Sequence, residues 1–270
     1  MIGFNYLGKM GQLGNQMFQY ASLRGIAKNR GFDFCIPYHN EVFDDGIGNK
    51  LRIELFDPFV MKNLTQSNIG IIKDDNPRTE GGFNFNETLF NTCSDNVSLY
   101  GYFQTEKYFK NIEKEIREDF IFKNEIAIPC KHMMCTIDTP IALHIRRGDF
   151  LINSANHHNL DLNYYQSCLD KFDSSRNVIV FSDDPEWCKE QSLFSSDRFL
   201  VAEGNDSYTD LCLMSLCSDF IIANSSFSWW GAWLSKAVDK VVCAPAKWFG
   251  PNNSHLDTSD LIPNEWVIVK

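Results

Sequence analysis

Short apolar runs alternate with amphipathic stretches through the second half of the chain. The apolar runs cover residues 141–145, 177–182, 199–202, 219–223 and 240–244. Between them, apolar residues recur at helical spacing at 161–173 and 206–217. Continuous apolar runs of this length are typical of strands buried on both faces of a parallel sheet. The alternation therefore predicts an α/β domain with a doubly wound, mainly parallel sheet.

The first half opens with a smaller unit of the same kind. An apolar stretch at 2–7 leads into a glycine-rich turn at 8–16, and 32–36 has the pattern of a second strand. We expect a helix between them, with Asn15 as its N-cap and Gly31 at its end. Such a β-loop-α-β unit presents backbone N–H groups at the start of its helix.

The middle of the chain has less periodicity. Residues 37–98 follow no clear period, and polar clusters such as 74–77 are typical of loops. A helix is expected over 105–118. Residues 123–140 contain two prolines, and we expect the domain linker there. The expected domains are 1–138 and 139–270.

Composition excludes several classes of protein. The 270 residues are 44% hydrophobic and 22% charged, which is typical of a globular chain, and the net charge of -10 argues against general nucleic-acid binding. The nine cysteines form no CxxC pair, so we expect buried free thiols and no zinc site. We see no signal peptide and no run approaching the roughly 20 apolar residues of a membrane span. A soluble, cytoplasmic protein is expected, at most peripheral to a membrane.

Two adjacent arginines stand out against this acidic background. Arg146 and Arg147 directly follow the apolar run 141–145. Ligands of open α/β sheets bind beyond the carboxyl ends of the strands, and a guanidinium group can fork two phosphate oxygens. A phosphate-bearing ligand is therefore one hypothesis. The alternative is a surface turn whose arginines pair with carboxylates such as Asp149.

Two further apolar runs also end in polar clusters. These are Ser182, Asp183 and Asp184 after one run, and Asn224, Ser225 and Ser226 after another. If the strands are parallel, all three clusters share one edge of the sheet. Hydroxyl and N–H groups at a helix start bind anions, and acidic side chains such as Asp210 accept from ribose or base groups. N-capping by the serines and dipole compensation by Asp210 are the simpler alternatives. Together with the arginines, the clusters favour a nucleoside-diphosphate site.

Three motifs in this order resemble glycosyltransferase family 11, the α-1,2-fucosyltransferases. They are Gly11 to Ala21 (GQLGNQMFQYA), His144 to Asp149 (HIRRGD), and Ala223 to Ala232 (ANSSFSWWGA), the last preceded by Asp210 to Ser215. Ile262 to Trp266 also fits, whereas 37–98 carries no match. The resemblance implies a GT-B-like α/β fold with two facing Rossmann-type domains and mainly parallel sheets. The first would hold the acceptor glycan and the second GDP-fucose.

The resemblance also implies a chemistry. L-fucose would pass from GDP-fucose to the 2-hydroxyl of a terminal galactose or similar hexose, with inversion, no cofactor and no essential metal. Alternatives are another linkage, or a GDP- or glycan-binding module without catalysis. Arg146 would hold the β-phosphate, His144 and Asp210 would face guanine, and Ser225, Ser226 and the Phe227 amide would cradle the diphosphate.

The remaining expected roles are less specific. Arg147, Asp183 and Asn224 belong to the same expected donor site, and the loop of Gln12, Leu13, Gly14 and Asn15 would close over it from the other domain. An inverting displacement needs a base near the acceptor hydroxyl. Asp149 lies nearest to the motif, as the base or as a brace for Arg147. His157, His158 and Asp161 are the other candidates.

Overall fold

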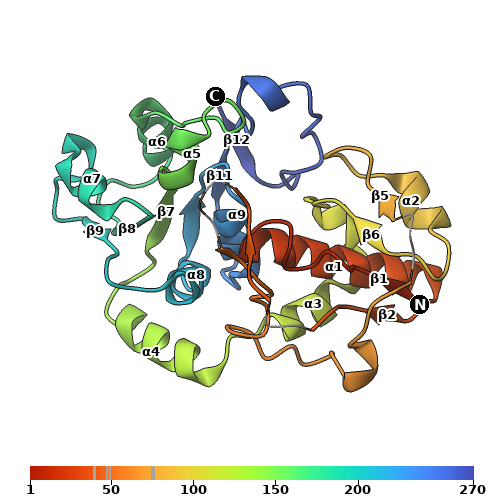
Figure 1. Cartoon of the computed structure of the whole chain (residues 1–270). Coiled ribbons are helices and arrows are strands. Elements are labelled where there is room, and N and C mark those ends of the chain that lie inside the picture. Colours follow the sequence, from red (N-terminus) through yellow and green to blue (C-terminus); the bar gives the residue numbers. More distant parts are fainter. Residues whose placement is uncertain (39–40, 47, 49, 74–76) are drawn as a thin grey trace. The chain divides into compact units, whose positions relative to one another are not determined.

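The computed structural model describes residues 1–38, 41–46, 48, 50–73 and 77–270 (Figure 1), so most of the expected loop at 74–77 lies outside the described residues. The chain forms two compact units. The first comprises Met1–Lys123 with Leu256–Pro263, and the second comprises Asn124–His255 with Asn264–Lys270. The expected division at residues 138 and 139 stays a prediction. Within the described residues, no helix is long and apolar enough to cross a membrane.

A six-stranded parallel sheet forms the centre of the second unit, as the apolar runs predict. Its order is β9-β8-β7-β10-β11-β12, so the strands order as 3-2-1-4-5-6 along the chain. The strands are β7 (Ile141–Ile145), β8 (Val178–Ser182), β9 (Phe199–Val201), β10 (Asp219–Ile221), β11 (Val242–Pro245) and β12 (Val267–Val269). The direction of winding reverses between β7 and β10, which is where ligands bind in sheets of this order.

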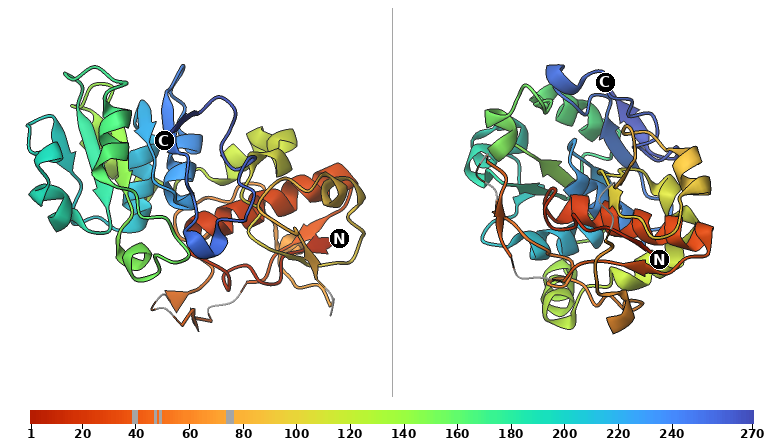
Figure 2. Two further views of the ribbon diagram at one scale, coloured as in Figure 1. Left: turned by 90° about the horizontal axis from the view of Figure 1, so that it is seen from above. Right: turned by 45° about the vertical axis from the view of Figure 1, so that its right-hand side comes forward.

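Helices lie beside this sheet (Figure 2), and four of them begin at a carboxylate or hydroxyl cap. They are α4 (Asn124–Met134), α5 (Gly148–Ile152), α6 (Leu162–Leu169), α7 (Pro185–Glu190), α8 (Ser207–Ser215) and α9 (Ser226–Leu234). Asp161, Asp184, Asp206 and Ser225 each accept a backbone N–H of the first turn that follows them. These side-chain caps compensate N–H groups that lack partners within the helix.

Two features of this unit were not foreseen from the sequence. The expected linker at 123–140 contains α4, which packs against α8 despite Pro129 within it. Strand β12 was missed because a three-residue run after a long irregular stretch carries little period. The tryptophans at 229, 230 and 233 pack against one another in the core, on α9.

The first unit is built around α1 (Leu13–Arg30), which has thirteen buried residues, glutamines among them. The expected N-cap Asn15 was wrong, because Gln12 occupies the cap position and Asn15 lies in the first turn. Gly31 ends the helix as expected, with φ at 68° and its N–H directed at the carbonyl groups of Ala27 and Lys28. Glycine adopts this left-handed conformation without a steric clash, because it has no Cβ.

Short strands surround α1 in place of the longer ones expected. They are β1 (Ile2–Gly3), β2 (Phe34–Cys35), β3 (Phe43–Asp44), β4 (Lys50–Leu51), β5 (Arg78–Thr79) and β6 (Leu99–Tyr100). Strands β1 and β2 pair in parallel, as do β5 and β6. The helix expected over 105–118 is broken into two 3-10 turns, Glu106–Tyr108 and Lys110–Ile112, and α3 (Glu113–Asp119). Helix α2 (Glu87–Thr92) and a 3-10 turn at Gln66–Asn68 also belong to this unit.

Eight of the nine cysteines are buried and all nine are free thiols, as expected from their spacing, with Cys135 the exposed one.

Candidate active site

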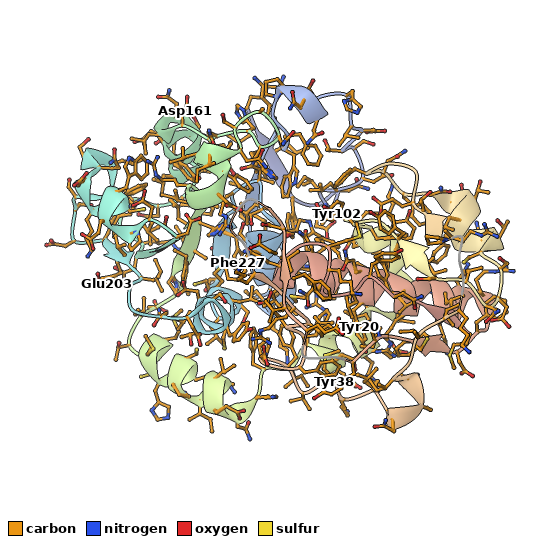
Figure 3. The ribbon with its side chains drawn as sticks, viewed as in Figure 1. Tyr20, Tyr38, Tyr102, Asp161, Glu203 and Phe227 are labelled. Atoms are coloured by element: carbon orange, nitrogen blue, oxygen red, sulfur yellow. The ribbon has the colours of Figure 1, made fainter. Side chains whose placement is uncertain are left out.

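The carboxyl ends of β7 and β10 bring the two C-terminal motifs of the sequence together. Strand β7 is hydrogen-bonded to β10 on one side and to β8 on the other, all in parallel. Three of the polar clusters seen in the sequence therefore emerge at one edge, as predicted. The rings of His144 and Phe227 lie 5.7 Å apart across the switch point, and Phe227 stands at the start of α9 (Figure 3).

Arg146 is held between two carboxylates. Its Nη2 lies 2.8 Å from Asp149 Oδ1, and its Nη1 lies 3.1 Å from Asp183 Oδ2. The side chain is only 23% exposed, so its orientation is fixed by neighbours from two elements. A guanidinium group has five N–H donors in one plane, so these two pairs leave others for a ligand.

Arg147 points to different partners. Its Nε lies 3.0 Å from Asp184 Oδ2, and its guanidinium carbon lies 3.8 Å from the ring centroid of Trp187. Its backbone N–H donates to Asp183 Oδ1 at 2.9 Å. Asp149, considered as a brace for Arg147, is therefore a partner of Arg146, and Asp184 is the partner of Arg147.

Both arginines pair with carboxylates, as the alternative of a surface turn predicts. Two guanidinium groups meet three carboxylates, so the formal charge of the cluster is 2 − 3 = −1. Gly148 permits this arrangement, because a Cβ on it would lie 2.7 Å from Asp183 Oδ2. The cluster can orient Arg146 rigidly, while attraction of an anion requires the further donors at the start of α9.

His144 is a neutral, buried imidazole at the same edge. The side chain is 5% exposed, and burial, with a smaller effect from the Arg146 charge, lowers its pKa to about 3. Its Nδ1 is buried without a hydrogen-bond partner. Buried polar atoms are usually paired, so an unpaired nitrogen beside a ligand-binding switch point is a notable feature of the site.

At the start of α9, Ser225 caps the helix and Asn224 connects two loops. Ser225 Oγ accepts the Phe227 N–H at 3.3 Å, which is the N-capping expected as the simpler alternative. Asn224 is 3% exposed, and its Nδ2 donates to the carbonyl groups of His158 and Trp248. Asn224 therefore joins two loops at this edge, and Ser226 begins the helix whose positive dipole end faces the edge.

Asp210 lies in the first turn of α8, the helix that follows β9. Its Oδ1 accepts from Asn205 Nδ2 at 2.9 Å. Burial raises its pKa to about 6 although the Asn205 hydrogen bond acts in the opposite direction. The carboxyl group therefore changes charge close to neutral pH.

The candidate catalytic bases differ in the contacts that their side chains make. Asp161 caps α6 by accepting the Tyr164 N–H at 3.1 Å, and Asp149 pairs with Arg146. The His157 ring stacks on Phe150 with centroids 4.1 Å apart and planes 10° apart. Burial lowers the pKa of His157, so its imidazole is neutral at pH 7. The pKa of His158 is lowered by burial as well.

In the first unit, buried glutamines hold the glycine-rich turn Gly8–Asn15, here called the signature turn. Gln16 Nε2 donates to the carbonyl groups of Gly11 and Arg52, at 3.2 and 2.7 Å. Gln19 Nε2 donates to Met10 and Gly101, both at 3.1 Å. The glutamines of the GNQMFQYA motif thus fix the backbone from which Gln12, Leu13 and Gly14 lead into α1.

In each unit, some partners of the expected site residues were not recognised from the sequence. They are Trp187, Asn205, and Gln104, whose Nε2 donates to Asn15 Oδ1 at 2.7 Å. The Asp184-Pro185 pair was a usable signal for Trp187, since a cap followed by proline places Trp187 in the first helical turn. Within the described residues, no group of three or more His, Cys, Asp and Glu side chains is arranged to hold a metal ion.

Known proteins share this fold. The structure of POFUT1 in complex with GDP aligns with a TM-score of 0.54 and 13% identity, covering 90% of this chain and 97% of that one. The structure of POFUT1 in complex with GDP-fucose aligns with a TM-score of 0.52 at 14% identity, covering 89% of this chain and 96% of that one. At such low identity the likeness concerns the fold alone, which is α/β and GT-B-like.

Sequence comparison reaches further. An α-1,2-colitosyltransferase of Escherichia coli is 31% identical, with 96% of this chain and 97% of the relative covered. A galactoside α-(1,2)-fucosyltransferase 2 of Pongo pygmaeus is 26% identical, with 85% of this chain and 68% of the relative covered. The match to the glycosyl transferase family 11 runs over residues 2–270 and so includes the signature turn, the arginine pair and the start of α9. The chain belongs to glycosyltransferase family 11.

Proposed function

We propose that this glycosyltransferase transfers L-fucose from GDP-fucose to the 2-hydroxyl of a terminal galactose or similar hexose. The observation that carries the proposal is Arg146, held by two carboxylates at the switch point of a 3-2-1-4-5-6 sheet. The proposed linkage is supported by relatives named for α-1,2 transfer, and the proposed donor by solved structures of this fold with GDP and GDP-fucose.

In the proposed reaction, the bond between fucose C1 and the β-phosphate oxygen breaks. The acceptor oxygen bonds to C1 from the opposite side, so the β-linked donor gives an α-fucoside, and the acceptor proton passes to a base. Negative charge grows on the β-phosphate, and the free N–H groups of Arg146 stabilise it there. The dipole of α9 adds to that stabilisation. No metal ion is required by this scheme, so turnover is expected to survive dialysis against EDTA.

The nucleotide base is proposed to lie against His144 and Asp210. The neutral imidazole of His144 offers its unpaired Nδ1, and an ionised Asp210 offers acceptors for the N–H groups of a purine edge. Both groups stand at the carboxyl edge of the sheet, where β7 ends and α8 begins. Asp149 and Asp183 are proposed as orienting partners of Arg146.

A second donor is supported by one specific comparison. The α-1,2-colitosyltransferase covers more of this chain, at higher identity, than the galactoside fucosyltransferase cited above. Colitose is L-fucose without its 3-hydroxyl group. The two GDP-sugars therefore differ by one hydroxyl group, and their turnover can be compared directly. The protein should therefore be incubated with GDP-fucose and with GDP-colitose in parallel, using lactose and other β-galactosides as acceptors.

The linkage of any product is read by NMR. An α-1,2 fucoside or colitoside supports the proposal and identifies the sugar. Another linkage contradicts the regiochemistry, and GDP binding without product from either donor supports a binding module.

The Arg146 role is tested by Arg146→Ala. We expect kcat/KM to fall by about 100- to 1,000-fold, the typical loss when one charge-stabilising donor is removed. Arg176→Ala is the matched control. Arg176 has a similar exposure of 24% and an ion pair of 2.6 Å with Asp219, but it lies at the amino edge of the sheet. Equal losses in the two variants, measured where both are folded, would remove the leaving-group assignment.

A further inference from the structure

Glu80 is a buried carboxyl group in the first unit that the proposed chemistry does not use. Its side chain is 7% exposed, and among the described residues no lysine or arginine pairs with it. Burial raises its pKa to about 8 even though backbone hydrogen bonds act in the opposite direction. A buried carboxyl group without a cationic partner costs free energy in such a place, so its presence calls for a role.

The loop Gly101–Gln104, here called the support loop, wraps around this carboxyl group. The backbone N–H groups of Tyr102 and Phe103 donate to it. Gly101 has φ at 150°, and a Cβ there would lie 2.8 Å from Glu80 Oε2. Phe103 has φ at 54°, a conformation that non-glycine residues rarely adopt. The carboxyl group thus accepts N–H groups that would otherwise lack partners in a strained stretch of backbone.

Topology explains why these groups meet. Glu80 directly follows β5, and the support loop directly follows β6. The two strands pair in parallel, with Thr79 opposite Tyr100, so the next residues of each strand emerge side by side. This edge is where parallel sheets carry their functional loops.

The support loop in turn holds the signature turn at two points. Gln104 Nε2 donates to Asn15 Oδ1 at 2.7 Å. The Gly101 carbonyl accepts from Gln19 Nε2, and the same amide group donates to the carbonyl of Met10. Gln104 is itself 7% exposed, so these bonds lie away from solvent. A continuous set of hydrogen bonds therefore runs from Glu80 through the support loop to both sides of the signature turn.

We propose that Glu80 is a positioning residue for the signature turn, acting through the support loop and Gln104. The functional part of this inference rests on the proposed transfer reaction, while the structural part does not. Glu80 lies in the region 37–98 that carries no family motif. Its contribution is to hold Asn15 and the Met10 carbonyl at fixed positions, with no contact to the reacting atoms.

The first measurement is hydrogen exchange of the intact protein, comparing wild type with Glu80→Gln. We expect exchange to become at least several-fold faster in residues 8–15 and 101–104, with 141–152 unchanged. Glu106→Gln is the matched control. Glu106 is 9% exposed and in the same unit, and it pairs with Lys110. Unchanged exchange at 8–15 in Glu80→Gln, or an equal change in Glu106→Gln, overturns the proposal whether or not the protein turns over GDP-fucose.

The second measurement is a double-mutant cycle between Glu80→Gln and Gln104→Ala. If Glu80 acts through Gln104, each single variant lowers kcat/KM for the donor by about tenfold, and the double variant loses little more than either single one. If the loss of kcat/KM in the double variant equals the product of the two single losses, the two residues act independently and the proposal is overturned. If Glu80→Gln fails to fold, the proposal is tested by hydrogen exchange of Gln104→Ala alone. It must speed exchange at 8–15 while leaving 77–82 protected, and protection retained at 8–15 counts against the mechanism.

Discussion

At the scale of single residues, burial shifts the pKa values of the two groups proposed to bind the nucleotide base in opposite directions. His144, whose pKa is lowered to about 3, stays neutral throughout the physiological range. Asp210, whose pKa is raised to about 6, changes charge within it. Desolvation is the first cause in both cases, since burial disfavours whichever form is charged. The pH dependence of donor binding therefore reports on Asp210.

We predict that donor binding weakens as pH falls through about 6. Above that value Asp210 is ionised and accepts N–H groups of the base, and below it the protonated carboxyl loses acceptor capacity. The measurement is KM for the GDP-sugar between pH 5 and 8, because the diphosphate of the donor does not titrate in this range.

Asn205 provides a control for the same group. Its hydrogen bond lowers the pKa of Asp210, so Asn205→Ala should move the midpoint of the KM profile upward. Asp210→Asn should remove the dependence and weaken donor binding at pH 8. A midpoint near 6 that persists in Asp210→Asn would assign the titration to another group.

At the scale of elements, the turn between β7 and α5 holds the arginine pair in place. Its position follows from strand register, since Ile145 pairs with Ser182 and the next residues, Arg146 and Asp183, emerge side by side. Gly148 lies against Asp183 and leaves no room for a larger side chain.

We predict that Gly148→Ala displaces the Asp183 side chain and leaves the fold intact. The added Cβ meets only the end of a side chain, which can move, and Gly148 lies in a helix where alanine is favoured. We expect kcat to fall by about tenfold with the free energy of unfolding changed by less than about 1 kcal/mol. Gly70→Ala is the control, because a Cβ there meets nothing within 4 Å. Full activity in Gly148→Ala would show that the Arg146–Asp183 pair is dispensable.

Element patterns also explain what could be predicted from the sequence. Strands β7 and β8 were predictable because each is an apolar run buried almost throughout, whereas the mostly exposed β12 was not. Their parallel direction then placed Arg146 and Asn224 at one edge. The breaks in 105–118 were not predictable, since Tyr108, Phe109 and Ile112 keep a helical period while the chain bends to bury all three. The hydrogen bond between Asn15 and Gln104 joins residues 89 positions apart, and no local pattern encodes it.

At the scale of the whole molecule, the chain leaves the second unit near its end and contributes residues 256–263 to the first. Leu261 is 1% exposed within that unit. Asp260 accepts the Phe85 N–H at 2.9 Å and forms an ion pair with Lys107. A short segment distant in sequence is thus attached by the buried Leu261 and Pro263 and by the Asp260 carboxylate.

We predict that Asp260→Ala lowers the free energy of unfolding by about 1–3 kcal/mol, the usual cost of leaving a partly buried donor without its acceptor. Chemical denaturation of the full chain measures it. Asp257→Ala is the control within the same segment, because Asp257 is exposed and its partner is the nearby Ser259, whose N–H it accepts at 2.9 Å. It should change stability by less than about 0.5 kcal/mol. Equal effects of the two variants would mean that the segment is held by its apolar contacts alone, and Leu261→Ala would then be the more destabilising change.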